Sequence, residues 1–274
     1  MSSDLFQQVS LSADEVALIF SLINQPELGK SILASTYGRL SHTTLEDKLT
    51  TASHSLLARR LAAITERGTV KLDESLEKMF YPIVKFDSMI QVTINDNPEE
   101  GPSITNVYLG RQGKFAAHQI ELGVVHHLST GKISDLPVLI TGWLGLPESA
   151  APDIEAELAA KPHTIPMRDF AELPEKSKKR GMAGLESLGF SPRLAELMVD
   201  ASIRPARKGT VVRVEASSET IAKTDLNEGG AGLLYLIAED SSWIFQFDHA
   251  NDAAVGKIVA GTNLHLNAIL TQLI

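Results

Sequence analysis

The chain opens with apolar residues at helical spacing. The segment Ser-Ala-Asp-Glu that starts at Ser12 has the form of a capping box, in which Ser12 caps the helix and Glu15 reaches back to it. Apolar residues follow three or four positions apart, namely Val16, Ile19, Phe20 and Ile23. Pro26 and Gly29 are typical of a helix end. The pattern therefore predicts a helix that begins at Ser12 and ends before Pro26.

A longer helical pattern follows at residues 45–67. Its apolar stripe consists of Leu45, Leu49, Ala52, Leu56 and Ile64. Gly68 stands where a C-terminal cap is expected. Residues 73–80 predict a further short helix with its apolar residues turned inward.

After Pro82 the apolar period changes from 3.6 to 2, which indicates strands. We expect strands over residues 89–94, 104–109 and 114–121, with a loop at 95–102 and a turn at 110–113. A helix is predicted at residues 134–144. In the later part of the chain we expect helices at 177–188, 192–200 and 252–273, and strands at 210–216, 232–238 and 242–248.

Proline is concentrated at residues 147–174, which hold five of the twelve prolines. This stretch predicts a linker between an N-terminal half, 1–146, and a C-terminal half, 175–274. The two halves repeat a similar order of elements at an offset of roughly 118 to 130 residues. For example, Val-Tyr-Leu at Val107 corresponds to Leu-Tyr-Leu at Leu234. Duplication explains this order, and a chance sharing of helix and strand patterns is the alternative. The predicted fold class is α+β, with two similar halves in a pseudo-twofold arrangement and helices packed on an antiparallel sheet.

Composition and charge exclude several classes of function but do not assign one. Among 274 residues there is no cysteine, which excludes disulfides, cysteine-ligated metals and a thiol nucleophile. The net charge of −9 disfavours nucleic acid as a partner, because phosphate binding depends on clustered Lys and Arg. The first residues lack the features of a signal peptide, and no apolar run is long enough to span a bilayer. We expect a cytoplasmic protein without membrane insertion.

Catalytic and cofactor motifs are missing from the sequence. The adjacent His126 and His127 are predicted to point to opposite faces of a strand, so they do not readily share a metal. No Gly-x-Ser-x-Gly segment, P-loop or dinucleotide fingerprint is present. We therefore assign no catalytic, cofactor-binding or metal-binding residues and expect no cofactor.

Two kinds of surface feature indicate a partner instead. The long loop 217–230 carries the apolar residues Ile221 and Leu226, and a hydrophobic loop tip can dock a partner. Basic residues cluster at Lys178, Lys179 and Arg180, and again at residues 204–208. A loop folded on its own domain and a solvated charged face are the alternative interpretations.

The order of these elements resembles the EspG family of type VII secretion-associated chaperones. The stretches that carry the resemblance are 11–18, 61–70, which contains the Arg-Gly of Arg67, 76–82 and the strand around Val92. The resemblance covers most of the chain. It implies a pair of α/β halves, no catalytic residues, and a cytosolic chaperone that binds the helical tip of a secreted PE/PPE-type protein.

The leading hypothesis is therefore a non-enzymatic, cytosolic protein-binding adaptor or chaperone whose partner is a helical secreted protein. Two alternatives remain at this point. One is a transcriptional regulator with a winged helix, in which residues 45–67 form the recognition helix. The other is an enzyme with a site between the two halves. Whether the chain forms a homo-oligomer stays open.

Overall fold

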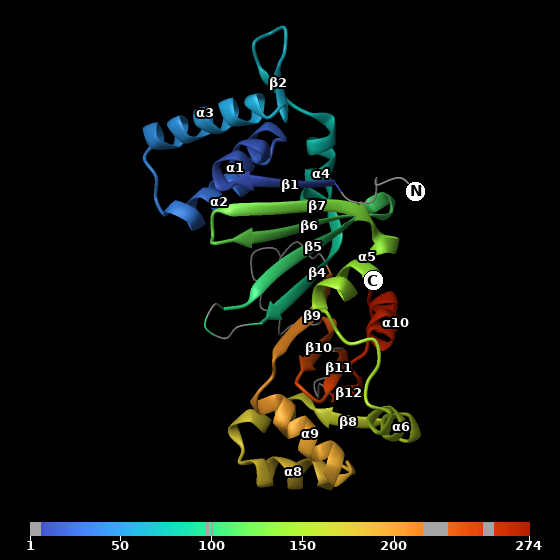
Figure 1. Cartoon of the computed structure of the whole chain (residues 1–274). Coiled ribbons are helices and arrows are strands. Elements are labelled where there is room, and N and C mark those ends of the chain that lie inside the picture. Colours follow the sequence, from blue (N-terminus) through green and yellow to red (C-terminus); the bar gives the residue numbers. More distant parts are fainter. Residues whose placement is uncertain (1–6, 97–98, 100, 216–229, 249–254) are drawn as a thin grey trace. The chain divides into compact units, whose positions relative to one another are not determined.

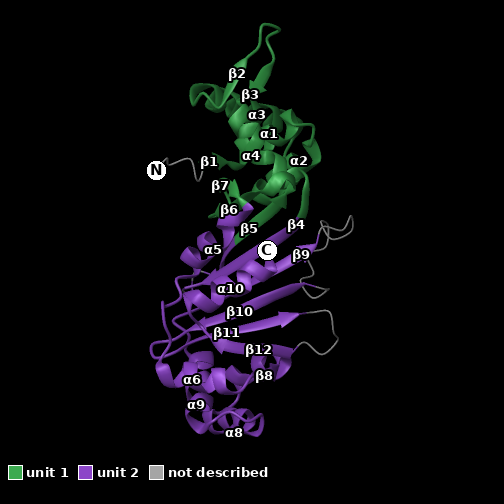
Figure 2. Ribbon diagram, turned by 90° about the vertical axis from the view of Figure 1, so that its right-hand side faces the viewer, with its two compact units in different colours: residues 1–87, 105–132 green, residues 88–104, 133–274 purple. Residues whose placement is uncertain are grey.

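The computed structural model describes residues 7–96, 99, 101–215, 230–248 and 255–274. The chain divides into two units, and the colours of Figure 2 separate them. Unit 1 consists of Met1–Asp87 and Thr105–Lys132, and unit 2 of Ser88–Ile104 and Ile133–Ile274. These boundaries differ from the halves expected on either side of residues 147–174.

Unit 1 combines an antiparallel sheet with four helices (Figure 1). Its strands lie in the order β1-β7-β6-β5, and the helices are α1 to α4. The strands are β1 (Gln7–Ser12), β5 (Ser103–Gly110), β6 (Lys114–Glu121) and β7 (Val125–Lys132). The helices are α1 (Ala13–Leu22), α2 (Pro26–Tyr37), α3 (His42–Ala58) and α4 (Glu74–Val84).

The core of unit 1 forms where α1, α3 and α4 bury their apolar faces against β1, β6 and β7. Leu11, Ala116 and Leu128 supply the sheet side of this core. Phe20 and Phe80 pack edge to face with their ring centroids 5.3 Å apart. Gly29 allows α2 to approach α1 closely, because a Cβ at this position would lie 2.6 Å from the carbonyl oxygen of Ala17.

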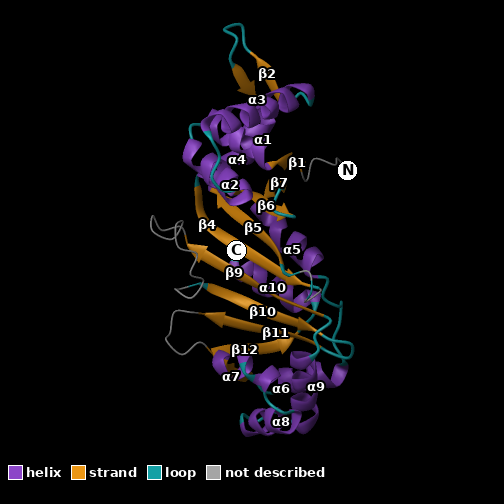
Figure 3. Ribbon diagram, turned by 90° about the vertical axis from the view of Figure 1, so that its left-hand side faces the viewer, coloured by secondary structure: helices purple, strands orange, loops and turns teal. Residues whose placement is uncertain are grey.

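Unit 2 is built on the strand order β4-β9-β10-β11-β12-β8, and every neighbouring pair in it is antiparallel. The strands are β4 (Phe86–Asn95), β8 (His163–Pro166), β9 (Arg207–Glu215), β10 (Ala231–Ile237), β11 (Ser242–Asp248) and β12 (Val255–Ala260). The helices are α5 (Leu136–Leu144), α6 (Pro152–Ala160), α7 (Met167–Ala171), α8 (Lys178–Ser187), α9 (Pro192–Ile203) and α10 (Asn263–Leu273). Figure 3 shows α6, α8 and α9 gathered beside β12 within this unit.

Side chains that alternate along the strands of unit 2 are buried on both faces. Trp243 and Phe245 of β11 join the core formed with α8 and α9. Ile244, between them, points to the other face and is also fully buried. Arg213 of β9 donates to the carbonyl oxygens of Leu273 and Ile274 at 2.7 and 3.2 Å, and so caps the end of α10.

Several predicted elements are confirmed. The capping box at Ser12 is present, with the Ser12 hydroxyl accepting from the Glu15 amide at 3.2 Å and Glu15 accepting from the Ser12 amide at 2.8 Å. The strands expected at 89–94, 104–109 and 114–121 correspond to β4, β5 and β6. The antiparallel sheet with packed helices confirms the predicted α+β class. The pseudo-twofold arrangement and the duplication stay predictions.

The helix predicted over residues 45–67 is wrong beyond Ala58. Arg60 has a φ of +59°, which turns the chain out of the helix. The following residues form a two-stranded hairpin from β2 (Ala62–Ile64) and β3 (Val70–Leu72). Gly68, with a φ of +75°, lies in the turn of that hairpin and not at a helix end. The recognition helix of the winged-helix alternative therefore stops at Ala58.

The single helix predicted over residues 252–273 is also wrong. Residues 255–260 form β12, which pairs with both β11 and β8, and α10 begins only at Asn263. Thr262 caps α10 by accepting from the His265 amide at 3.2 Å. The helix expected to end before Pro26 does so, because α1 ends at Leu22, and Pro26 starts α2 in the first helical position. Gly29, also expected at a helix end, lies inside α2.

Residues 147–174, predicted as a linker, contain α6, β8 and α7. Ile154, Ile165, Phe170 and Leu173 of this stretch are buried in the core of unit 2. Proline serves here as a helix starter, since Pro152 begins α6. The stretch is thus part of a folded core, although its composition resembles that of a connection.

Candidate partner-binding site

Helices α8 and α9 of unit 2 form one wall of the candidate site. Ser191 caps α9 by accepting from the Leu194 amide at 3.2 Å, and Pro192 occupies the first helical position. Glu157 of α6 accepts from the Ser191 amide at 3.1 Å and from the Ser191 hydroxyl at 2.7 Å, which fixes the start of α9. A Cβ at Gly181 of α8 would lie 3.0 Å from Val199, so the two helices approach closely at this point.

An exposed ion-pair network joins the same two helices. Lys178 of α8 contacts Glu196 at 3.0 Å and Asp200 at 2.9 Å, and these two acids lie one turn apart on α9. Hydrogen bonds to Asp200 and then to Glu196 raise the pKa of Lys178 above its ordinary value. All three side chains are 42 to 51% exposed. Water therefore reaches the network, and its contribution to stability is small.

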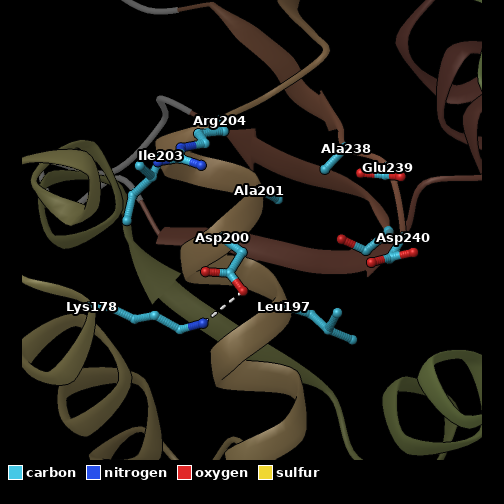
Figure 4. A pocket seen from close by; sticks show the side chains of 10 residues that line it. Lys178, Leu197, Asp200, Ala201, Ile203, Arg204, Ala238, Glu239 and Asp240 are labelled. Atoms are coloured by element: carbon cyan, nitrogen blue, oxygen red, sulfur yellow. Dashed lines mark hydrogen bonds and ion pairs between the residues drawn. The ribbon is translucent and has the colours of Figure 1, made fainter.

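A pocket of about 480 Å³ opens beside this network (Figure 4). One side is formed by α9 with Leu197, Asp200 and Ile203, and the other by the turn between β10 and β11. The turn is ordered by its own hydrogen bonds, since the Ala238 amide donates to the Ser241 carbonyl at 2.8 Å. The Trp243 indole N–H also donates to the Ser241 hydroxyl, at 3.0 Å. A second pocket, of about 330 Å³, lies against the same turn and is lined by Pro147 and by residues 149–151.

The first pocket is mixed in character. Ile203 is 40% exposed at the end of α9 and offers an apolar contact. Arg204 supplies a positive charge, and Glu239 and Asp240 place two carboxylates on the turn opposite. An apolar contact surrounded by charges of both signs is suited to another protein surface, where a central apolar residue is buried inside a polar rim.

The structure separates the predicted basic residues. Lys178 lines the 480 Å³ pocket, whereas Arg180 lines a different pocket of about 180 Å³ next to Leu185. Lys179 is exposed between them. Consecutive residues of a helix point about 100° apart, so a cluster in the sequence does not form a single patch on α8. Ile221 and Leu226 lie outside the described residues.

The second basic cluster, at residues 204–208, is also divided. Arg204 faces the pocket, but Arg207 forms an ion pair with Asp96 and donates to the Leu144 carbonyl at 3.0 Å, at the end of α5. Arg207 therefore supports the fold of unit 2. Sequence reasoning missed Ile203, Glu239 and Asp240. Glu239 lies in the connection between the strands expected at 232–238 and 242–248, but nothing in the sequence indicated that this connection lies opposite α9.

The adjacent histidines of β7 point to opposite faces, as the strand alternation predicted. His126 is 1% exposed and lies 2.8 Å from His118 of β6, with Nδ1 facing Nε2, and the two rings are stacked. His127 faces solvent and contacts the Ser10 hydroxyl at 2.9 Å and the Glu121 carboxylate at 2.7 Å. Burial, followed by the charge of His126, lowers the pKa of His118 to about 4. Burial is also the main cause that lowers the pKa of His126.

No group of three or more His, Asp or Glu side chains in the described ranges is arranged to hold a metal ion. Among the helices of those ranges, none combines the length and apolar character that crossing a membrane requires.

Comparison with known proteins gives a result at the level of structure. No protein-family model matches the sequence, and no curated protein matches it. The chain is similar to the solved structure of the Mycobacterium tuberculosis type VII secretion system chaperone EspG5 in complex with the PE25–PPE41 dimer, with a TM-score of 0.63 and 11% identity. The similarity covers 97% of this chain and 95% of the matched chain. It establishes the fold alone, and that fold is the mixed α and β, EspG-like one that the sequence resemblance implied.

Proposed function

We propose that this protein is a non-enzymatic adaptor or chaperone that acts in the cytosol and holds a helical protein destined for secretion. The observation that carries the proposal is the structural similarity to a type VII secretion chaperone along nearly the whole chain. A fold shared over such a length supports a shared mode of action, although function itself depends on the site.

The pocket between α9 and the β10–β11 turn is our candidate for the docking site. Ile203 provides the apolar contact at its edge, and the hydrogen-bonded turn provides a rigid opposing wall. A helix end fits such a site because it presents one or two apolar side chains flanked by polar groups. Lys178 is part of the same wall and is held by its two acidic partners on α9.

The experiment that tests this proposal is site-specific photo-cross-linking in the native host. A photoreactive amino acid replaces Ile203 in one variant. In a matched control it replaces Leu264, which is 75% exposed on α10 of the same unit and lines neither pocket at the turn. We expect a cross-link from position 203 to a helical segment of one defined protein, and none from position 264. Equal labelling from both positions, or none from position 203, would overturn the assignment of the pocket.

A further inference from the structure

The free edge of β1 in unit 1 is closed by side chains of α1 and α3. Within the described residues β7 is the strand that pairs with β1, so the other edge of β1 carries outward-facing backbone groups. The hydrogen bonds identify these groups. Arg59 donates to the carbonyl oxygen of Ser10 at 2.8 Å, and the Ser12 amide donates to the Glu15 carboxylate at 2.8 Å. In an antiparallel edge strand both backbone groups of every second residue face outward, which here means Gln8, Ser10 and Ser12.

Glu15 and Arg59 are bound to each other as well as to the strand. The nearer Arg59 nitrogen lies 2.9 and 3.1 Å from the two carboxylate oxygens of Glu15. Ser55, one turn earlier on α3, donates to the same carboxylate at 2.8 Å. Glu15 is only 4% exposed, so this contact is largely protected from water. Arg59, which follows α3, and Glu15 of α1 therefore hold a fixed cation and carboxylate against the second half of the β1 edge.

Without these side chains, the backbone groups at the edge of β1 would be free to pair with another strand. A second copy of this chain offers the same edge, and two antiparallel β1 strands are complementary because their outward groups repeat at the same spacing. Charged side chains placed over an edge are a known means of preventing such association. Pairing with a second strand would need the Ser10 carbonyl and the Ser12 amide. Both are already hydrogen-bonded, the carbonyl to Arg59 and the amide to Glu15.

We propose that Arg59 and Glu15 act as an edge plug that prevents two copies of this chain from pairing through β1. The plug leaves both groups of Gln8, the amide of Ser10 and the carbonyl of Ser12 as the outward groups not bound by these two side chains. The proposal explains why the Arg59 guanidinium binds both the Glu15 carboxylate and the Ser10 carbonyl oxygen of β1. The proposal concerns unit 1 and is independent of the docking site assigned to unit 2.

The absence of cysteine allows a direct test. Ser10→Cys places one thiol at the exposed residue of β1 that lies opposite its own copy when the outward groups of two β1 strands pair, and mild oxidation then joins such a pair. We expect little cross-linked dimer with Arg59 present. With Arg59→Met we expect about tenfold more, which corresponds to about 1.4 kcal/mol and to recovery of one or two edge hydrogen bonds.

Three further variants control the result. Arg39→Met removes an exposed arginine from outside the network and should leave the dimer fraction unchanged. Gln8→Pro removes an outward amide and should lower the added dimer, because proline cannot donate to a pairing strand. Since Arg59→Met leaves Glu15 without its cation, Glu15→Gln combined with Arg59→Met keeps a neutral cap, and circular dichroism confirms that each variant is folded. A folded Arg59 variant with no added dimer, or a dimer insensitive to Gln8→Pro, would overturn the proposal.

Discussion

The two units use ion pairs in opposite ways. In unit 1, Glu15 is buried and its partner Arg59 is bound to it and to a strand carbonyl. In unit 2, Lys178 and its two acidic partners are about half exposed and are bound only to each other in the contacts described above. The difference is one of desolvation. A buried carboxylate depends on its partner, whereas an exposed one exchanges that partner for water at little cost.

The comparison indicates where each unit is rigid and where it is available for binding. The Glu15 network joins β1, α1 and α3 into one block. The Lys178 network leaves its charges accessible at the edge of a pocket, where a partner can replace one contact by another. The hairpin turns of the two units also differ in character. Leu122 at the β6–β7 turn of unit 1 is apolar and 88% exposed, while the β10–β11 turn of unit 2 carries the acidic residues Glu239 and Asp240.

The largest expected effect is at Glu15, whose carboxylate is buried although its partner Arg59 is 40% exposed. Arg59→Met should lower the free energy of unfolding by about 2 kcal/mol, because it leaves this carboxylate without its cation. Adding Glu15→Gln should recover part of that loss, since a neutral amide has a smaller desolvation cost. Urea unfolding followed by circular dichroism measures both values. A loss below that of an exposed pair would show that Glu15 is better solvated than its burial indicates.

Acid should destabilise the protein through its buried histidines. The folded pKa of His118 is about 4, below the value of about 6.5 expected for an unfolded chain, so the unfolded state binds the proton first. Stability should therefore fall as pH decreases from about 6.5 to 4, by at most about 1.4 kcal/mol per pH unit for this group.

His118→Gln should flatten this pH dependence. His163 of unit 2 is the matched comparison, because burial is the main cause that lowers its pKa as well, but Glu157 opposes the shift. His163→Gln should change the slope less than His118→Gln. Unfolding curves at several pH values decide the order, and a larger effect at His163 would reverse this part of the comparison.

A smaller effect, of opposite sign, is expected at the β6–β7 turn. Leu122 has a φ of +50° and Gly123 a φ of +73°, a conformation in which a leucine is strained. Leu122→Asn should stabilise the protein by about 1 kcal/mol. The midpoint of urea unfolding should rise with an unchanged slope, and a fall would indicate that the exposed leucine packs against something in solution.

The smallest expected effect is at Lys178. Lys178→Ala should leave the free energy of unfolding nearly unchanged, because exposed ion pairs contribute little. The same urea assay provides the measurement. A loss as large as that of Arg59→Met would remove the distinction between the two networks.

The sequence predicted the local structure correctly where contacts between residues close together in the chain determine it. Ser12 was expected as a cap and is one, and the helix expected at 192–200 begins at Pro192. The helices predicted at 45–67 and 252–273 failed because strand pairing decided the conformation. Residues 62–64 pair with the neighbouring β3 in a hairpin, and residues 255–260 lie between β11 and the distant β8. Helical spacing of apolar residues does not reveal such partners.

The candidate site was harder to foresee for a similar reason. Lys178 was identified from its basic neighbours, yet α8 directs Arg180 to another pocket. Ile203 and the turn at Glu239 are more than thirty residues apart and meet only because α9 packs against β10 and β11. The sequence contains the residues of the pocket but does not show that they lie close together in the fold.

The central claim is that the α9 and β10–β11 pocket binds a helical partner, and a calorimetric titration tests it most directly. The partner is the protein identified by cross-linking from position 203, titrated into the unmodified chain, Ile203→Asp and the matched control Leu264→Asp. We predict at least about tenfold weaker binding for Ile203→Asp, because a charge would enter the apolar contact, and unchanged binding for Leu264→Asp. Equal affinity for all three proteins would contradict the account.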